Sequence, residues 1–87
     1  MKRKLQVLGP GCAKCRMLAD HAERAARELG LDFELEKITD FDEMLRFGLV
    51  ATPALVVDGA VKVVGHVPST PRLRELLAAL LEEGVRP

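Results

Sequence analysis

The sequence predicts an α/β fold in which helices flank a four-stranded mixed sheet, with the element order β-α-β-α-β-β-α. Three observations predict it: short strand-like runs of apolar residues, apolar stripes at helical spacing between them, and a tight turn that joins the last two strands. The β-α-β segments let the first strands run parallel, and the final hairpin supplies antiparallel neighbours. The chain has 87 residues, so we expect one domain over residues 1–87 with a single modest core.

The first strand and the first helix are separated by a glycine-rich segment. Residues 4–8 are a short, mostly apolar run, which Gly-Pro-Gly at residues 9–11 ends. Apolar residues at helical spacing then predict a helix over residues 12–29, which Gly30 terminates. The apolar stripe of this helix consists of Leu18, Ala22, Ala25 and Leu29.

The polar face of this helix carries charges of both signs. Arg16 and Asp20 are four residues apart, as are Glu23 and Arg27. Opposite charges at this spacing are neighbours on a helix surface, so two ion pairs are expected.

A second strand and a short helix follow. Residues 31–38 begin with a regular alternation of apolar and acidic side chains, which is typical of a strand with one buried face. Asp40, with Glu43 three residues later, resembles a capping box. It predicts a short helix that ends near Gly48.

The last part of the chain is a hairpin followed by a helix. Apolar runs at residues 54–57 and 61–64 flank Asp58-Gly59, which is a strong hairpin signal. Ser69-Thr70-Pro71 predicts the start of the last helix, because proline suits the first helical position. The apolar stripe of that helix consists of Leu73, Leu76, Leu77, Leu80 and Leu81.

Composition excludes several classes of function. The chain carries 13 basic and 13 acidic residues, so bulk charge predicts no binding to nucleic acid or to a membrane. The apolar runs are far shorter than a membrane span, and no signal peptide is visible. We therefore expect a cytoplasmic protein. In that reducing compartment, a close cysteine pair is catalytic or binds metal more often than it forms a structural disulfide.

The most informative motif is Cys12-Ala13-Lys14-Cys15, which contains both cysteines of the chain. The spacing places the two sulfur atoms in the first turn of a helix, close enough to form a disulfide or to share a metal. Unpaired N–H groups and the helix dipole stabilise a thiolate there. A thiolate is the form that attacks disulfides and binds metals. Lys14 either lowers the pKa of the thiol or is an ordinary solvated side chain.

Two classes of function use such a motif: thiol–disulfide exchange and, as the alternative, soft-metal binding. A closed zinc site needs four ligands. His21 and His66 are badly placed to complete one within a single chain, although a dimer would supply four thiolates. We expect His21 at the surface or boundary of the fold, and His66 either as an ordinary loop residue or at the rim of the site. We predict no bound metal.

A second motif extends the argument beyond the cysteines. Thr52 of Ala51-Thr52-Pro53 follows Cys15 by 37 positions and precedes an apolar strand. Together with the strand before GPGCAKC, the LVVDG hairpin and the GHVPS turn, this motif makes nearly the whole chain resemble the thioredoxin superfamily. The resemblance is greatest to the small glutaredoxin-like redox-active disulfide proteins of bacteria and archaea. It implies a thioredoxin-like fold.

The resemblance also implies a thiol–disulfide oxidoreductase without a cofactor other than its redox-active disulfide, Cys12–Cys15. Cys12 would attack a substrate disulfide, and Cys15 would release the reduced product. Thr52 and Pro53 would bind the substrate, with a cis peptide bond that lets Thr52 offer its backbone N–H and C=O. The implied partners are disulfide-containing proteins and an upstream reductant, either a reductase or glutathione. We expect a monomer.

Overall fold

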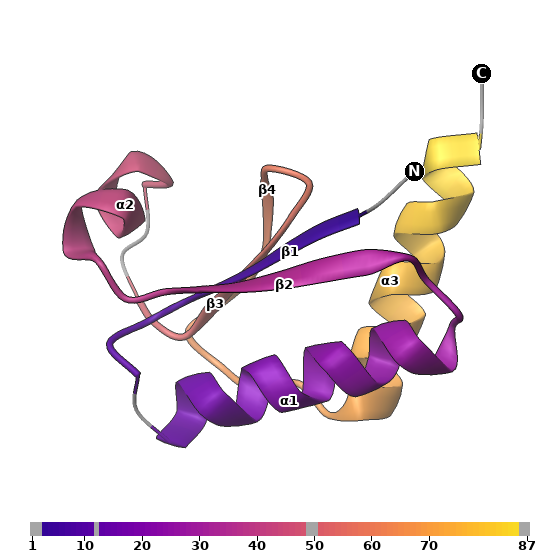
Figure 1. The fold of residues 1–87 in the computed structure, drawn as a ribbon, viewed down its shortest axis with the longest axis horizontal. Coiled ribbons are helices and arrows are strands. Elements are labelled where there is room, and N and C mark those ends of the chain that lie inside the picture. The colour runs from indigo at the N-terminus through magenta and orange to yellow at the C-terminus, as the bar shows by residue number, and fades with distance from the viewer. Residues whose placement is uncertain (1–2, 12, 49–50, 86–87) are drawn as a thin grey trace.

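The computed structural model describes residues 3–11, 13–48 and 51–85. Its elements follow the predicted order (Figure 1): β1 (Arg3–Leu8), α1 (Ala13–Glu28), β2 (Phe33–Ile38), α2 (Phe41–Arg46), β3 (Ala54–Val57), β4 (Ala60–Val64) and α3 (Thr70–Val85). The predicted α/β class with a four-stranded mixed sheet is therefore confirmed. None of the helices in these ranges is long and apolar enough to cross a membrane.

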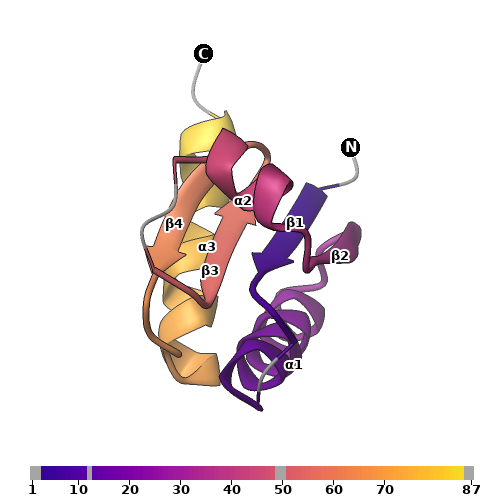
Figure 2. The same cartoon turned by 90° about the vertical axis from the view of Figure 1, so that its left-hand side faces the viewer.

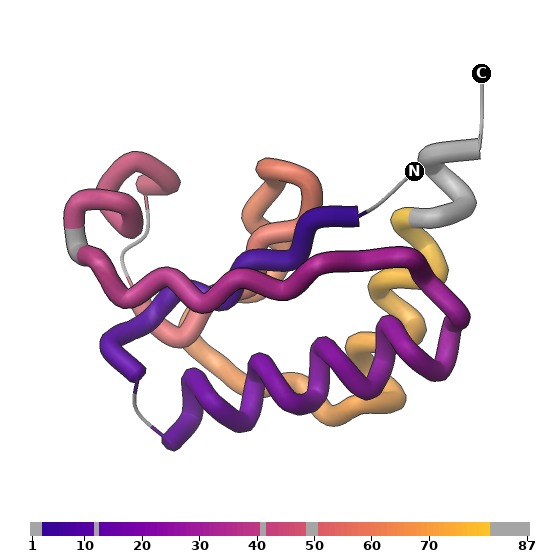
Figure 3. Tube along the Cα trace, in the orientation of Figure 1, coloured from indigo at the N-terminus to yellow at the C-terminus, as the bar shows by residue number. Residues whose placement is uncertain are grey.

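The strands form a sheet in the order β2-β1-β3-β4, so β1 and β3 lie at its centre. β1 runs parallel to β2, with Leu5 beside Leu35, and antiparallel to β3, with Leu8 beside Ala54. A parallel pair needs a crossover connection, and α1 provides it by running back along the sheet (Figure 3). β3 and β4 form an antiparallel hairpin with a register shift after Leu55.

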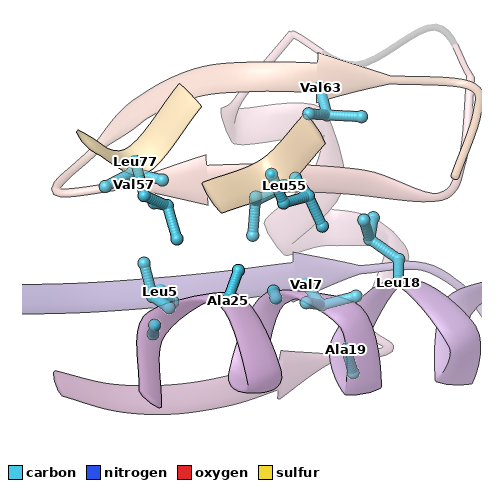
Figure 4. Close-up of a cluster of buried hydrophobic side chains, with 12 residues drawn as sticks. Leu5, Val7, Leu18, Ala19, Ala25, Leu55, Val57, Val63 and Leu77 are labelled. Carbon is cyan, nitrogen blue, oxygen red and sulfur yellow. The ribbon is translucent and has the colours of Figure 1, made fainter. Parts of the chain in front are cut away.

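The sheet separates two groups of buried side chains. Helices α1 and α3 cover one face, and α2 lies on the other (Figures 1 and 2). Leu5 of β1 belongs to the larger core, together with Leu18 and Leu77 from the helices (Figure 4). Leu8 belongs to the smaller core, together with Met44 of α2. Because successive residues of a strand point to opposite faces, the central strands are buried on both sides.

Backbone hydrogen bonds set the boundary between α1 and β2. Gly30 has a φ of 68°, and its N–H donates to the C=O of Arg27, while the N–H of Leu31 donates to the C=O of Ala26. This pattern is a Schellman motif, which satisfies the last carbonyl groups of a helix. Because Leu31 belongs to this motif, β2 begins at Phe33 and not at residue 31 as the alternation predicted.

The starts of α2 and α3 also follow from local hydrogen bonds. The carboxylate of Asp40 caps α2 by accepting a hydrogen bond from the N–H of Asp42 (2.9 Å). The predicted capping box is incomplete, because Glu43 pairs with Arg46 (3.3 Å). At α3, the hydroxyl of Ser69 accepts from the N–H of Arg72 (3.3 Å), and the helix begins one residue before Pro71.

The β3–β4 hairpin turns at Asp58 and Gly59. Their φ values are 49° and 85°, and a type I′ turn requires positive φ at both central positions. The carboxylate of Asp58 accepts a hydrogen bond from the N–H of Lys4 (2.9 Å) and pairs with Arg3 (2.6 Å). The Lys4 hydrogen bond, followed by the Arg3 contact, holds the pKa of Asp58 below its ordinary value.

Candidate active site

Cys15 of the first predicted motif and Thr52-Pro53 of the second meet where β1 ends and β3 begins. β1 ends at Leu8, the antiparallel β3 begins at Ala54, and these two residues pair with each other. The segment that leaves β1 and the segment that enters β3 therefore lie side by side. Gly9 and Pro53 are the first residues beyond the pair.

Cys15 lies in the first turn of α1 and is buried, with 6% of its surface exposed. Its sulfur lies against the backbone of Gly9. A Cβ built on Gly9 would overlap this sulfur and would lie 3.4 Å from the Cβ of Cys15. Because glycine has no side chain, position 9 leaves space for the sulfur of Cys15. The backbone that follows β1 thus helps to fix the position of this sulfur.

Thr52 borders the same small volume. The Cβ built on Gly9 would lie 3.7 Å from the Cβ of Thr52. The sulfur of Cys15 and the side chain of Thr52 are therefore both neighbours of Gly9. Thr52 is exposed, Pro53 is buried, and the peptide bond between them is cis. The C=O of Pro53 accepts a hydrogen bond from the N–H of Gly65 (2.8 Å), which ties this loop to the segment after β4. The fold thus brings together residues that are far apart in sequence.

Cys12 lies outside the described residues, and its role stays a prediction. Its neighbours in sequence, Gly11 and Ala13, are both exposed, and α1 begins at Ala13. The first turn of a helix offers unpaired N–H groups and the positive end of the dipole to a group at its start. Lys14 is exposed in this turn.

One predicted ion pair near the site is wrong. Asp20 pairs with Arg24 (3.2 Å) and not with Arg16, whereas Glu23 and Arg27 pair as expected (2.6 Å). The acidic residue precedes its basic partner by four positions in both observed pairs. This order is the more stable one, because it agrees with the helix dipole.

Arg16 instead lines a small pocket beside the sulfur of the second cysteine. The pocket has a volume of about 30 Å³, which is enough for a water molecule or two. Cys15 and Arg16 line it from α1, and Lys37 lines it from β2. The other lining residues are Val7, Gly9, Gly11 and Thr39.

Both histidines form hydrogen bonds with backbone carbonyl groups. Nδ1 of the half-buried His21 lies 2.9 Å from the oxygen of Pro68, which links α1 to the segment before α3. Nδ1 of the exposed His66 lies 3.1 Å from the oxygen of Val64. Within the described part of the chain, no three His, Cys, Asp or Glu side chains gather as a metal-binding group.

Sequence reasoning missed two parts of this site. The pattern marks Gly9 only as the end of a strand, although a glycine there also signals a close approach of the backbone to another group. Lys37 lies on the strand beside β1, and no local pattern relates it to Arg16. Only the parallel pairing of β1 with β2 brings Lys37 to the site.

Comparison with known proteins identifies similar chains. A family model described as a thioredoxin domain matches residues 3–78. The chain is 45% identical over 75 residues to a thioredoxin of Methanothermobacter thermautotrophicus, and the match covers 86% of this chain and 97% of that protein. It is 33% identical over 78 residues to a thioredoxin of Methanocaldococcus jannaschii, with 90% of each protein covered.

Solved structures with a similar fold include two more distant proteins. One is thioredoxin-2, a component of the malaria parasite protein secretion machinery, with a TM-score of 0.64 and 19% identity over 90% of this chain and 82% of that one. The other is chloroplastic thioredoxin z, with a TM-score of 0.67 and 17% identity over 93% of this chain and 80% of that one. At such identities the similarity concerns the fold alone.

Proposed function

The chain belongs to the thioredoxin family of thiol–disulfide oxidoreductases, and we propose that it exchanges with disulfides through the dithiol of Cys12 and Cys15. The observation that carries this proposal is the position of the Cys15 sulfur, which lies against Gly9 and beside Thr52. A buried thiol there is next to an exposed backbone segment along which a substrate can lie. This arrangement suits the thiol that acts in the second step, on a substrate that is already joined to the first thiol by a mixed disulfide.

The proposed reaction has two exchange steps. The thiolate of Cys12 attacks one sulfur of the substrate disulfide, a mixed disulfide forms, and the other substrate sulfur leaves as a thiolate. The thiolate of Cys15 then attacks the sulfur of Cys12, the Cys12–Cys15 disulfide forms, and the second substrate thiolate leaves. The substrate gains two electrons, which the dithiol loses.

Thr52 and Pro53 are the proposed substrate-binding residues. Thr52 is exposed, and its backbone N–H and C=O are proposed to bind an extended substrate segment, in the manner of a strand added to a sheet. The buried Pro53 and its hydrogen bond to Gly65 hold the loop in place. Substrate binding and thiol exchange would thus occur on adjoining segments.

Lys14 has two proposed roles that one experiment separates. If Lys14 stabilises the thiolate of Cys12, Lys14→Gln should raise the pH midpoint of alkylation of Cys12 by iodoacetamide. If Lys14 is only solvated, that midpoint should match the wild-type value. Lys62→Gln, which removes an exposed charge from β4, is the control.

Membership of the family implies disulfide substrates and a reductase in general terms. We propose protein or small-molecule disulfides as substrates, a reductase or glutathione as the source of electrons, and a monomer that works in the cytoplasm without a further cofactor. The alternative function is binding of a soft metal by the same two cysteines. It predicts one tightly held metal ion in the purified protein and no disulfide reductase activity.

Trapping of mixed disulfides tests the proposal. Cys15→Ser should accumulate a mixed disulfide between Cys12 and a substrate, because the thiol that releases the product is missing. Cys12→Ser should accumulate none. The products are identified by mass spectrometry without reduction, and insulin is a suitable substrate.

Two outcomes would contradict the proposal. Equal trapping by both variants would show that the two thiols do not have separate roles. Absence of insulin reduction by the wild-type protein, together with one metal ion per chain in elemental analysis, would favour the metal-binding alternative.

A further inference from the structure

Arg16 differs from the other arginines in the described ranges, because it alone has no carboxylate within ion-pair distance. Arg16 is exposed in the first turns of α1. Asp20 lies one turn further along the helix, but its carboxylate pairs with Arg24. The arginines that do form ion pairs are Arg3, Arg24, Arg27, Arg46, Arg72 and Arg74.

A second cation lines the same pocket. Lys37 lies near the end of β2, and no acidic side chain of the described residues pairs with it. By strand alternation Lys37 shares the face of Leu35, which packs into the core under α1 and α3. Lys37 thus lines the pocket from the sheet, and Arg16 lines it from the helix.

The pocket between these cations also contains Cys15. Gly9 and Gly11, which line it as well, add no side chains that would fill it. Its volume is about 30 Å³, and its surface is almost wholly apolar, so Arg16 and Lys37 line it mainly with their apolar stems while their charged ends lie toward solvent at its mouth. Two uncompensated positive charges at the mouth of the pocket that Cys15 lines therefore favour a substrate that carries negative charge close to its disulfide.

We propose that Arg16 and Lys37 form a subsite for a carboxylate that the substrate carries within a few bonds of its disulfide. The guanidinium of Arg16 can bind both oxygens of a carboxylate, and the ammonium of Lys37 supplies a second charge. The anionic group would lie at the mouth of the pocket, between the charged ends of Arg16 and Lys37, while Cys12 attacks the disulfide. The inference rests on the proposed function, and it adds the chemical class of the preferred substrate.

Three small disulfides of different charge test this subsite. They are 3,3′-dithiodipropionate, which carries two carboxylates, neutral bis(2-hydroxyethyl) disulfide, and cystamine, which carries two ammonium groups. Reduced protein is mixed with each disulfide, and the second-order rate constant of its oxidation is measured by quenching with an alkylating agent. Each rate constant is divided by that of a small neutral thiol with the same disulfide, which removes differences in intrinsic reactivity.

We expect the wild-type protein to prefer the anionic disulfide, and we expect this preference to fall as ionic strength rises. Arg16→Gln and Lys37→Gln should each reduce the preference about two- to fivefold, and the double variant about tenfold, as for ion pairs at a partly open site. Arg27→Gln is the matched control, because it removes an exposed arginine from the same helix outside the pocket and leaves Asp20 paired with Arg24. It should keep the wild-type preference.

Several results would overturn the subsite. One such result is a wild-type protein that shows no preference for the anionic disulfide, and another is a double variant that keeps that preference. An equal fall in the rate constants for all three disulfides would assign the two cations to the thiols and not to the substrate. A wild-type protein that none of the disulfides oxidises would instead contradict the proposed function.

The source of the carboxylate is settled by a pair of peptide disulfides with Asp or Asn next to the cysteine. A preference for the Asp peptide that Arg16→Gln removes would place the carboxylate on a protein substrate. A preference for 3,3′-dithiodipropionate without any for the Asp peptide would place it on a small molecule.

Discussion

The sulfur of Cys15 occupies the space in which a side chain on Gly9 would begin. Gly9 directly follows β1, and Cys15 lies in the first turn of α1, so the contact joins the central strand to the reactive helix. An exposed cysteine side chain can move when a neighbouring residue is replaced by a larger one. This cysteine is buried, and its freedom to move is correspondingly small.

Gly9→Ala should therefore impair the second thiol more than the first. The new methyl group displaces the sulfur of Cys15. The proposed attack by Cys12 should be unaffected. With an aromatic disulfide such as 5,5′-dithiobis(2-nitrobenzoate), the first chromophoric thiol should appear at the wild-type rate, and the second should appear at least about tenfold more slowly. Overpacking should also lower the free energy of unfolding by about 1–3 kcal/mol.

Gly30→Ala serves as the control for Gly9→Ala. A Cβ at Gly30 meets no atom within 4 Å, but its φ of 68° strains an alanine there. The control should thus lower stability without changing the ratio of the two rates. Equal ratios in Gly9→Ala and wild type would show that Cys15 does not need the space at Gly9.

Leu55→Ala should destabilise the fold strongly. Leu55 is fully buried in the larger core (Figure 4), and removal of a buried leucine leaves a cavity that costs about 2–5 kcal/mol. Leu45 on α2 is 70% exposed, so Leu45→Ala should change stability by no more than about 0.5 kcal/mol. Urea denaturation followed by circular dichroism measures both, and similar losses would contradict the assignment of the core.

Asp58→Asn should remove a stabilising contribution that depends on pH. The pKa of Asp58 is lower in the folded protein than its ordinary value of 3.8, so the carboxylate stabilises the fold above that pH. This contribution is lost as the pH falls below 3.8 toward the lowered pKa. Asparagine also tolerates the positive φ of the turn, which restricts the change to the charge.

The free energy of unfolding of Asp58→Asn should be about 1 kcal/mol or less below that of wild type at neutral pH. This difference in the free energy of unfolding should disappear as the pH is lowered. A difference that stays constant from neutral to acidic pH would contradict the role of the Asp58 charge.

His21→Ala should loosen the contact between α1 and the segment before α3. A carbonyl oxygen only accepts hydrogen bonds, so Nδ1 of His21 donates to Pro68, and loss of this bond should cost about 0.5–1.5 kcal/mol. His66→Ala is the matched control, because its exposed ring bonds to Val64, which lies two residues away in the sequence. Thermal unfolding should show a lower midpoint for His21→Ala than for His66→Ala.

Much of the fold could be predicted because its signals are local. Helical spacing, strand alternation and the Asp58-Gly59 turn each depend on a few neighbouring residues. The start of β2 was misplaced because Leu31 is apolar enough for a strand, yet its N–H completes the cap of α1. A hydrogen bond to the preceding helix decides that boundary.

The site could be predicted only in part, because its parts lie on different elements. The sequence identifies the cysteines and Thr52-Pro53 as separate motifs, and the pairing of Leu8 with Ala54 brings Cys15 and Thr52 together. The partner of Asp20 could not be deduced from spacing, since Arg16 and Arg24 both lie four residues away. The subsite residues Arg16 and Lys37 become neighbours only in three dimensions.

The burial of β1 and β3 on both faces has a consequence for hydrogen exchange. The amide groups of Leu5–Leu8 and Ala54–Val57 open to solvent only when both cores open, so they should exchange with deuterium as slowly as the whole molecule unfolds. The reactive segments are attached directly to the ends of these two strands. The proposed cycles of oxidation and reduction would thus change these loops while the two central strands stay closed.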